Sequence, residues 1–444
     1  MQNNLHVVVG LGESGFSVLR FLTQHKIPVA VVDTRQKPPK IGDFLELYPH
    51  VPIVLGKLDC HLLEDATKII LSPGIAITEP PIQAQIKKGT MVCGDIELFA
   101  TAVNAPVIAI TGTNAKSTVT TLVGEMVAQA GLDVKVGGNL GIAALDLLTI
   151  PPPDVYVLEL SSFQLETTYS LYPKVATILN VSPDHLDRYD SFADYAAAKQ
   201  RVYTHCEMAV FNRDDELTYT SIVDEQYKFG FTANTPRGRE FGVIDEGEKF
   251  LSFEQTKLLS IDALTIPGMH FVANALAAIA IGHAFGLPME AMLQALKQFK
   301  GLPHRCVFVR ELKGVKWYND SKGTNVGASL AAINGLGEVI AGKLILIAGG
   351  IGKHADFTQL VGPIQKYVRT VILIGEAAHE LYALLKDKVN CVLADTMLDA
   401  VEKSQAQAQP ADCVLLSPAC ASMDMFKNFE HRGDVFTDLV RALT

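Results

Sequence analysis

The first part of the chain alternates short apolar runs with an amphipathic stretch. The apolar runs at 5–9, 28–32 and 69–71 have the length of buried strands, and residues 16–25 have the spacing of a helix. Strands that alternate with helices predict βαβ units around a parallel sheet. The pattern changes near Cys93, so we expect a first, Rossmann-like domain over residues 1–93.

The alternation continues through the centre of the chain. Strands are expected at 106–110, 155–160 and 175–181, a helix at 119–130, and strands with turns over 211–265. The apolar stretch 271–287 is interrupted by polar residues and indicates a buried helix, not a membrane span. We expect a second domain, with a parallel sheet, over residues 94–299.

The last third of the chain repeats the pattern after a Lys-Gly-Leu linker at 300–302. Strands are expected at 315–318, 343–348, 371–374 and 413–416, and most of them end in polar or glycine loops. A chain of 444 residues is too long for one core. The prediction is an α/β protein of three domains, the third being Rossmann-like over residues 300–444.

A glycine-containing loop joins the strand at 106–110 to the helix that follows. Its sequence is Thr111-Gly112-Thr113-Asn114-Ala115-Lys116-Ser117-Thr118. A loop of this kind cradles phosphates with backbone N–H groups, adds a lysine charge and offers a hydroxyl to Mg²⁺. The match is imperfect, because Ile110 replaces the first glycine and Ala115 the glycine before the lysine. The loop predicts a nucleotide-triphosphate site.

Two further strands of the central region deliver polar side chains to the same edge. Glu159 ends the strand at 155–160, and His185 follows the strand at 175–181. The carboxyl ends of parallel strands meet at one edge, so both side chains can reach a metal beside the phosphate loop. Asp184 and Asp187 are competing candidates.

The N-terminal domain carries its own glycine turns. Gly10–Gly15 has the spacing G-x-G-x-x-G, and Asp33 follows about twenty residues on. A second turn contains Gly74. Two such turns suggest a nucleotide or nucleotide-sugar site without establishing a nicotinamide. The loop around Asn139 either closes over a ligand or simply turns the chain.

Two polar residues lie within expected helices. Ser191 begins a helix with a capping sequence, and the pattern alone places Lys199 of that helix on a solvated face. Asn274 lies in the apolar helix, where an amide needs a hydrogen bond, so it either caps a neighbour or meets a ligand.

Composition narrows the choice of partners. The net charge of −10 argues against nucleic acid, so anionic ligands must be held by a few local Lys and Arg side chains. The seven cysteines form no C-x-x-C pair, which favours reduced thiols in the cytoplasm. No signal peptide is evident at the beginning of the chain, and no partner membrane is expected.

Several motifs together resemble the Mur ligases, and within them the members that add D-glutamate to the peptidoglycan precursor. The motifs are the phosphate loop, Leu158–Glu166, Asn180–Arg188, His304-Arg305, Asn319–Asn325, Ser417–Ser422 and Phe426–Phe429. The resemblance covers the whole chain. It implies an ATP-dependent ligase that joins D-glutamate to UDP-N-acetylmuramoyl-L-alanine through an acyl phosphate and releases ADP and phosphate. The first domain would bind the UDP group, the second ATP, and the third the incoming amino acid together with part of ATP.

The resemblance also implies roles for individual residues. ATP would contact Gly112, Thr113, Asn114, Ala115, Lys116, Ser117, Thr118, Asn274, Arg305 and Asp320. The UDP-substrate would contact Glu13, Ser14, Asp33, Thr34, Arg35, Gly74, Asn139, Ser161, Gln164 and His185. D-glutamate would contact Lys322, Thr324, Lys353, Ser422 and Phe429. Two Mg²⁺ ions, with Mn²⁺ as an alternative, would be bound by Ser117, Glu159, His185 and a Lys199 carbamylated by CO₂, and Lys116, His185 and Lys199 would be catalytic.

The chain departs from the family pattern at two positions, and rival functions remain. The family usually has Gly at position 115 and Asn at the position of Phe271. The first rival is a folylpolyglutamate-type ligase, which lacks an N-terminal domain like residues 1–93. A nicotinamide oxidoreductase would leave the phosphate loop unexplained, and a P-loop switch protein would hydrolyse ATP without an amino acid. We expect a monomer.

Overall fold

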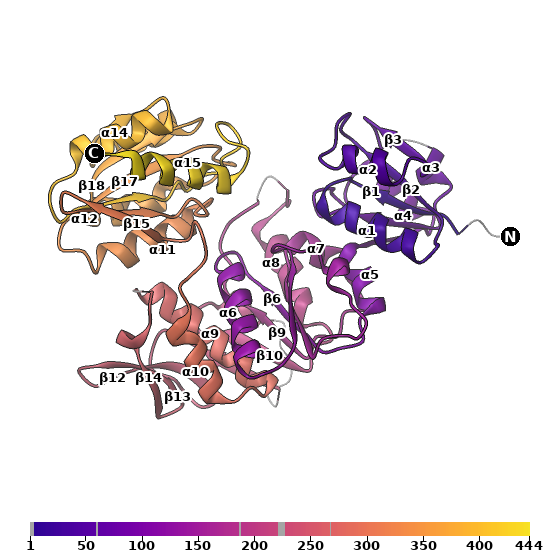
Figure 1. Cartoon of the computed structure of the whole chain (residues 1–444), viewed down its shortest axis with the longest axis horizontal. Coiled ribbons are helices and arrows are strands. Elements are labelled where there is room, and N and C mark those ends of the chain that lie inside the picture. Colours follow the sequence, from indigo (N-terminus) through magenta and orange to yellow (C-terminus); the bar gives the residue numbers. More distant parts are fainter. Residues whose placement is uncertain (1–3, 59–60, 186–187, 221–226, 267) are drawn as a thin grey trace.

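The computed structural model describes residues 4–58, 61–185, 188–220, 227–266 and 268–444, so the candidate Asp187 lies outside the described residues. In Figure 1 these residues form three lobes, coloured indigo, magenta to salmon, and orange to yellow in chain order. The described strands form sheets of five, nine and six strands, one for each lobe. The predicted α/β class is confirmed, and the domain boundaries after residues 93 and 299 stay predictions.

The first lobe is a parallel sheet in the order β3-β2-β1-β4-β5. Its strands are β1 (His6–Val9), β2 (Val29–Asp33), β3 (Ile53–Leu55), β4 (Lys68–Leu71) and β5 (Met91–Gly94). Its helices are α1 (Glu13–Gln24), α2 (Ile41–Leu47), α3 (His61–Glu64), α4 (Pro80–Lys87) and α5 (Asp95–Ala102). Helix α1 begins three residues earlier than predicted, because its polar first turn contributes nothing to the apolar pattern.

In the sheet of the second lobe, the strands lie in the order β14-β13-β12-β11-β10-β9-β6-β8-β7. Its strands are β6 (Val107–Thr111), β7 (Val134–Gly138), β8 (Val155–Glu159), β9 (Val175–Ile178), β10 (Met208–Asn212), β11 (Lys228–Phe231), β12 (Glu240–Asp245), β13 (Lys249–Phe253) and β14 (Thr256–Ser260). Its helices are α6 (Lys116–Gln129), α7 (Ser162–Glu166), α8 (Phe192–Gln200), α9 (Met269–Phe285) and α10 (Met289–Gln298). Strands β12, β13 and β14 pair antiparallel and extend the parallel part of the sheet.

The third lobe has the order β15-β16-β20-β17-β18-β19, with β15 antiparallel at one edge. Its strands are β15 (Val307–Leu312), β16 (Val315–Asn319), β17 (Leu344–Gly349), β18 (Val368–Ile374), β19 (Asn390–Leu393) and β20 (Cys413–Leu416). Its helices are α11 (Val326–Gly337), α12 (Val361–Tyr367), α13 (Ala378–Leu385), α14 (Met397–Gln407) and α15 (Phe429–Ala442).

The central strand β6 is buried along its whole length, as parallel strands covered on both faces are. Alternate residues enter two cores: Ile108 and Ile110 pack with α6 and α9, while Val107 and Ala109 join a core shared with α1 and α5 of the first lobe. Helix α9 is buried on most sides, as predicted. In the part of the chain that the structure describes, no helix combines the length and apolarity needed to cross a bilayer.

Candidate active site

The phosphate loop connects β6 to α6. Helix α6 begins at Lys116, and Ala115 before it is left-handed, with φ +65°. The Nζ atom of Lys116 donates to the carbonyl oxygens of Gly112 and Thr113, each at 2.9 Å. The first-turn N–H groups of a helix lack partners within the helix and therefore suit an anion. The left-handed Ala115 carries strain of about 1 kcal/mol.

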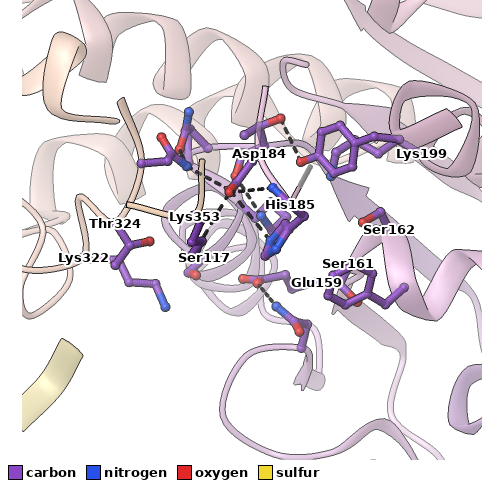
Figure 2. A pocket seen from close by; sticks show the side chains of 18 of the residues that line it. Ser117, Glu159, Ser161, Ser162, Asp184, His185, Lys199, Lys322, Thr324 and Lys353 are labelled. Carbon is purple, nitrogen blue, oxygen red and sulfur yellow. Dashed lines mark hydrogen bonds and ion pairs between the residues drawn. The ribbon is translucent and has the colours of Figure 1, made fainter. Parts of the chain in front are cut away.

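A cavity of about 280 Å³ lies in front of this loop. Figure 2 shows that side chains from two lobes point into it. The central lobe contributes Lys116, Ser117, Asn139, Glu159, Ser161, His185 and Lys199, among others, and the C-terminal lobe contributes Arg305, Lys322, Thr324 and Lys353. The structure thus brings together residues far apart in the sequence, such as Lys116 and Lys353.

The cavity concentrates positive charge. Burial lowers the pKa of Lys116, and it lowers the pKa of Lys322 to about 8, with nearby cations adding to the effect. Burial also lowers the pKa of Arg305, while Glu159 raises it. Cations that are desolvated next to one another are unfavourable without an anion. The arrangement therefore fits a ligand with several negative charges, such as a nucleotide triphosphate.

Lys199 is buried, with 2% of its surface exposed. Its Nζ atom donates to the carbonyl oxygen of Gly112 at 2.9 Å and lies 4.5 Å from the ring centre of Tyr195. Burial and the nearby Lys116 hold its pKa well below the usual value. The solvated face predicted from the pattern alone is wrong, because Tyr195 and Lys199 lie on the buried face of α8 and bond to Thr113 and Gly112 of the phosphate loop.

Glu159 offers a place for a cation. Its Oε1 atom accepts from Asn139 Nδ2 at 2.7 Å, whereas Oε2 is buried without a hydrogen-bond partner. An unpaired buried carboxylate oxygen suits Mg²⁺, which in many enzymes takes one or two carboxylates together with substrate phosphates. The described residues contain no group of three or more His, Cys, Asp or Glu that could hold a metal.

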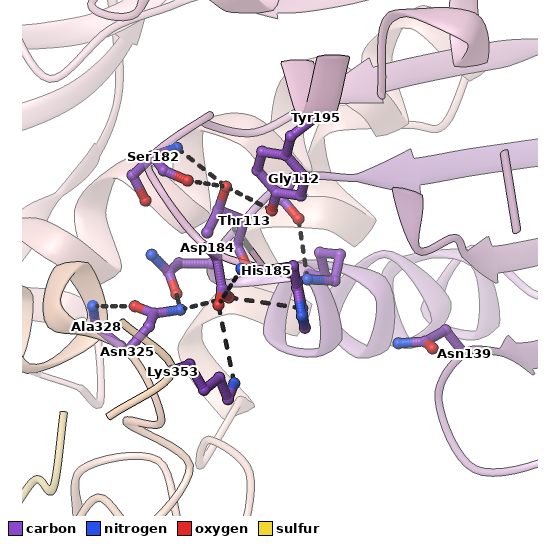
Figure 3. Close-up of polar contacts among 12 residues, drawn as sticks. Gly112, Thr113, Asn139, Ser182, Asp184, His185, Tyr195, Asn325, Ala328 and Lys353 are labelled. Atoms are coloured by element: carbon purple, nitrogen blue, oxygen red, sulfur yellow. Dashed lines mark hydrogen bonds and ion pairs between the residues drawn. The ribbon is translucent and has the colours of Figure 1, made fainter. Parts of the chain in front are cut away.

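Asp184 and His185 lie where the central and C-terminal lobes meet (Figure 3). The Asp184 carboxylate accepts hydrogen bonds from Asn325 Nδ2 at 3.0 Å and from the backbone N–H of His185 at 2.9 Å. It also lies 3.8 Å from Lys353 Nζ. Asn325 Nδ2 also donates to Asn114 Oδ1 at 3.1 Å. Asp184 therefore links the two lobes. Burial lowers the pKa of His185 and so favours the neutral imidazole ring, which is the form that binds a metal.

A second cavity, of about 260 Å³, adjoins the phosphate loop on the side of Asn114 and Ala115. Asn274, Arg305 and Asp320 line it, so the interpretation in which Asn274 meets a ligand is favoured. Phe271 also lines it and stacks on Phe299, with ring centres 5.9 Å apart and an interplanar angle of 3°. Burial raises the pKa of Asp320 to about 7, while Ser417 Oγ donates to its carboxylate at 2.7 Å.

The residues predicted to bind the UDP-substrate fall into two groups. The first group lies at or just after the carboxyl ends of β1, β2 and β4, which are neighbours in the first sheet: Glu13, Ser14, Asp33, Thr34, Arg35 and Gly74. Asn139, Ser161 and His185 line the main cavity, and the buried Gln164 hydrogen-bonds to Ser161.

The first of these groups is held by close packing. Asp33 accepts from the N–H of Leu11 at 2.7 Å and from Arg35 Nη2 at 2.7 Å, and these bonds outweigh burial and lower its pKa. A Cβ at Gly15 would lie 1.8 Å from the Gly10 carbonyl oxygen, so close packing requires that glycine. Sequence analysis placed a boundary near Cys93 and gave no role to Asp95, although this residue directly follows β5 and a polar residue directly after a strand is itself a signal.

The predicted D-glutamate residues are only partly gathered. Lys322, Thr324 and Lys353 line the main cavity, whereas Ser422 and Phe429 are not among its lining residues. Ser422 is 4% exposed, and the ring of Phe429 lies 3.6 Å from Lys322 Nζ. Phe429 thus lies directly behind Lys322, outside the lining of the cavity.

Comparison with known proteins places the chain in a family. Residues 4–94 match the Mur ligase MurD-like N-terminal domain, residues 110–282 the Mur ligase middle domain, and residues 304–420 the Mur ligase glutamate ligase domain. The chain is 50% identical over 442 residues to the UDP-N-acetylmuramoylalanine–D-glutamate ligase of Pseudomonas aeruginosa, covering 99% of this chain and 98% of that protein. It is 48% identical over 441 residues to the enzyme of the same name from Coxiella burnetii, covering 99% of each.

Solved structures agree on the fold. A pseudomurein peptide ligase type C from Methanothermus fervidus superposes with a TM-score of 0.63 at 18% identity, covering 100% of both chains. The UDP-N-acetylmuramate-alanine ligase of Thermotoga maritima gives a TM-score of 0.63 at 18% identity, covering 99% of each. With matched domains along its length and full-length relatives of this identity, the chain belongs to the Mur ligase family.

Proposed function

We propose that this chain is an ATP-dependent ligase that adds D-glutamate to UDP-N-acetylmuramoyl-L-alanine in the cytoplasm, acting as a monomer. The observation that carries the proposal is the cavity in which the phosphate loop faces Lys322, Thr324 and Lys353 of the third lobe. The names of the full-length relatives suggest the substrates. The match of residues 4–94 to a Mur ligase N-terminal domain disfavours a folylpolyglutamate-type enzyme.

The proposed first step transfers a phosphoryl group. The terminal carboxylate of the UDP-substrate attacks the γ-phosphorus of ATP, the bond to ADP breaks, and an acyl phosphate forms. Two anions must approach each other, so positive charge has to be supplied in advance. Lys116 is the first residue of α6. Arg305 reaches the same helix from the third lobe, where its Nη2 atom donates to Ser117 Oγ at 3.0 Å.

The donor set fits magnesium as well as phosphate. Ser117 and Glu159 would hold one ion, and His185 with a carbamylated Lys199 the other, with Mn²⁺ as an alternative metal. The unpaired Glu159 Oε2 and the lowered pKa of His185 support this assignment. Bound metal would add Lewis-acid charge at the transferred phosphate.

The environment of Lys199 supports its carbamylation. The lowered pKa favours the neutral amine, whose lone pair can attack CO₂. The new N–C bond gives a carbamate and one proton is released, which turns a buried cation into an anion that can bind metal. Enzyme prepared without CO₂ should be weakly active and regain activity on addition of bicarbonate. A CO₂-free enzyme with full activity would contradict this assignment.

The proposed second step forms the amide bond. The amine of D-glutamate attacks the acyl carbon, and phosphate leaves from the tetrahedral intermediate. Lys322 and Lys353 would bind the carboxylates of D-glutamate, with Thr324, Ser422 and Phe429 completing the pocket. Since ATP would contact both the second and the third lobe, closure of the third lobe on binding would complete the site.

Mass spectrometry of the nucleotide product tests the proposal. With ATP, Mg²⁺, D-glutamate and UDP-N-acetylmuramoyl-L-alanine, the product should be heavier than the substrate by one glutamyl residue. A folate that gains L-glutamate while the UDP-substrate stays unchanged would favour the folylpolyglutamate alternative. A UDP-substrate of unchanged mass after ATP has been consumed would contradict ligase activity.

A further inference from the structure

Asp95 lies at the junction of the first two lobes. It is the first residue of α5, directly after β5, and 2% of it is exposed. Its Oδ2 atom accepts from Gln164 Nε2 at 3.1 Å. Oδ1 is buried and makes no well-formed hydrogen bond, although the Ser14 hydroxyl and the backbone N–H of Ile96 lie close enough to favour the carboxylate form. Burial raises the pKa of Asp95 to about 6, so the group is mainly a carboxylate at neutral pH and can only accept hydrogen bonds.

Gln164 is held at both ends of its amide. Its Oε1 atom accepts from the Ser161 N–H at 3.1 Å, and its Nε2 donates to Asp95. A carboxylate requires a donor and a backbone N–H requires an acceptor, so both partners demand the same orientation of the amide. The side chain of Gln164 is 1% exposed, which leaves water little access to replace either bond.

This orientation determines what Ser161 offers to the cavity. The Ser161 hydroxyl donates its proton to Gln164 Oε1 at 3.2 Å and accepts from the Gln164 N–H at 3.2 Å. A hydroxyl has one proton and two lone pairs, so one lone pair remains. Ser161 lines the main cavity, as Figure 2 shows, and therefore presents an acceptor there.

We propose that Asp95 is a positioning residue that orients Gln164, so that Ser161 accepts a hydrogen bond from an N–H or O–H group of the sugar-nucleotide substrate. The substrate's amide groups and sugar hydroxyls are donors of this kind, whereas its phosphates and carboxylate are not. The inference rests on the proposed function for the identity of the substrate. Asp95 is not among the residues that line the main cavity, and it lies next to Ser14 of the first lobe as well as to Gln164.

Asp95→Ala tests the inference through the Michaelis constants. The KM for the UDP-substrate should rise about tenfold, the effect of one lost hydrogen bond, with kcat and the KM for ATP unchanged. Asp95→Asn should stay within about twofold of the wild type, because its amide oxygen still accepts from Gln164. Glu97→Ala is a matched control on α5: it removes a buried carboxylate bonded to Tyr169 and Ser170 and should leave that KM unchanged.

A double mutant separates positioning from general destabilisation. If Asp95 acts through Gln164, Asp95→Ala should add nothing to the KM of a Gln164→Ala enzyme. The side-chain amide signal of Gln164, assigned in ¹H–¹⁵N spectra by its loss in Gln164→Ala, should exchange faster with water in Asp95→Ala than in the wild type or in Glu97→Ala. Unchanged exchange would overturn the inference whatever the activity.

The kinetic outcomes distinguish the two proposals. A wild-type enzyme that does not use the UDP-substrate would refute the proposed function, and the exchange measurement would still test the positioning of Gln164. If the wild type is active, a normal KM for the UDP-substrate in Asp95→Ala would refute the role of Asp95 and leave the proposed function in place. An equal rise of KM for all three substrates would do the same.

Discussion

Individual side chains give the cavity its chemistry. The chain as a whole is acidic, with a net charge of −10, yet several lysines and an arginine converge on one cavity. The pKa values of Lys116, Lys199, Lys322 and Arg305 are lowered because burial removes the water that would stabilise each charge. An anionic ligand replaces that water, so binding and protonation should be coupled.

Lys322 makes this coupling measurable. Its pKa of about 8 means that it is charged below pH 8 and neutral above it. Since the charged form attracts the D-glutamate carboxylates, affinity should be greatest below pH 8 and fall as the pH rises through that value. Calorimetric titration between pH 7 and 9 measures this, and Lys322→Arg should remove the dependence because arginine stays charged. A constant affinity in the wild type would argue against a role for Lys322.

Ala115 should carry backbone strain that glycine would not. Because the φ of Ala115 is +65°, Ala115→Gly should raise the free energy of unfolding by about 1 kcal/mol or less. Glycine relieves the backbone strain, but it also gives the unfolded chain more conformational entropy, which offsets part of the gain. Ala411, with φ +74°, is a matched control outside the two cavities. Both variants should shift the urea midpoint similarly, and only Ala115→Gly should change nucleotide affinity. A lower midpoint for Ala115→Gly would refute the strain.

Positions at the ends of buried strands could be predicted from the sequence, whereas positions that depend on how a helix packs could not. Lys116, Glu159 and His185 follow buried strands, and parallel pairing brings such positions to one edge. Lys199 could not be placed from its own helix, since the spacing of apolar residues in α8 does not reveal which face meets the phosphate loop. Asp95 acts across two lobes, and only the fold brings it to Gln164.

At the scale of elements, the strands were predicted well and the helix starts less well. Strand β20 has the predicted bounds, because a buried apolar run marks a parallel strand clearly. Helix α6 begins at Lys116 instead of residue 119, so the lysine lies within the first turn. Polar first turns escape an analysis of apolar periodicity, and in this protein those turns carry residues that we expect in the binding sites, such as Glu13 and Ser14 of α1 and Lys116 and Ser117 of α6.

Helix α8 presents Lys199 to the cavity at a cost in desolvation. Lys199→Met should keep the packing and remove the charge, so the thermal midpoint should not fall by more than a few degrees. The rate of ligation should fall at least about a hundredfold, as for a lost transition-state contact. Lys174→Met, which removes a surface lysine paired with Glu207, should leave both unchanged. Near-normal turnover in Lys199→Met would contradict a catalytic role.

At the scale of the whole molecule, polar contacts hold the third lobe against the phosphate loop. Asn325 bonds to both Asn114 and Asp184 of the central lobe, and it also caps α11 by accepting from the Ala328 N–H at 2.8 Å. These two roles can be separated, because a shorter side chain can cap the helix without reaching the other lobe.

Asn325→Ser should keep the cap and lose the bridge between lobes. The thermal midpoint should stay near that of the wild type, while small-angle X-ray scattering should show a larger radius of gyration without ligands. Asn325→Ala should lose the cap as well and be less stable by about 1 kcal/mol. An unchanged radius in both variants would show that the bridge does not set the arrangement of the lobes.

Phosphate release tests the account's central claim most directly. It should be measured with ATP, Mg²⁺ and UDP-N-acetylmuramoyl-L-alanine, comparing D-glutamate, L-glutamate and no amino acid. We expect release that requires D-glutamate, because the acyl phosphate is consumed only when the correct amine attacks it. Release that is the same in all three conditions would leave a phosphate-binding site in place and contradict the assignment as a D-glutamate ligase.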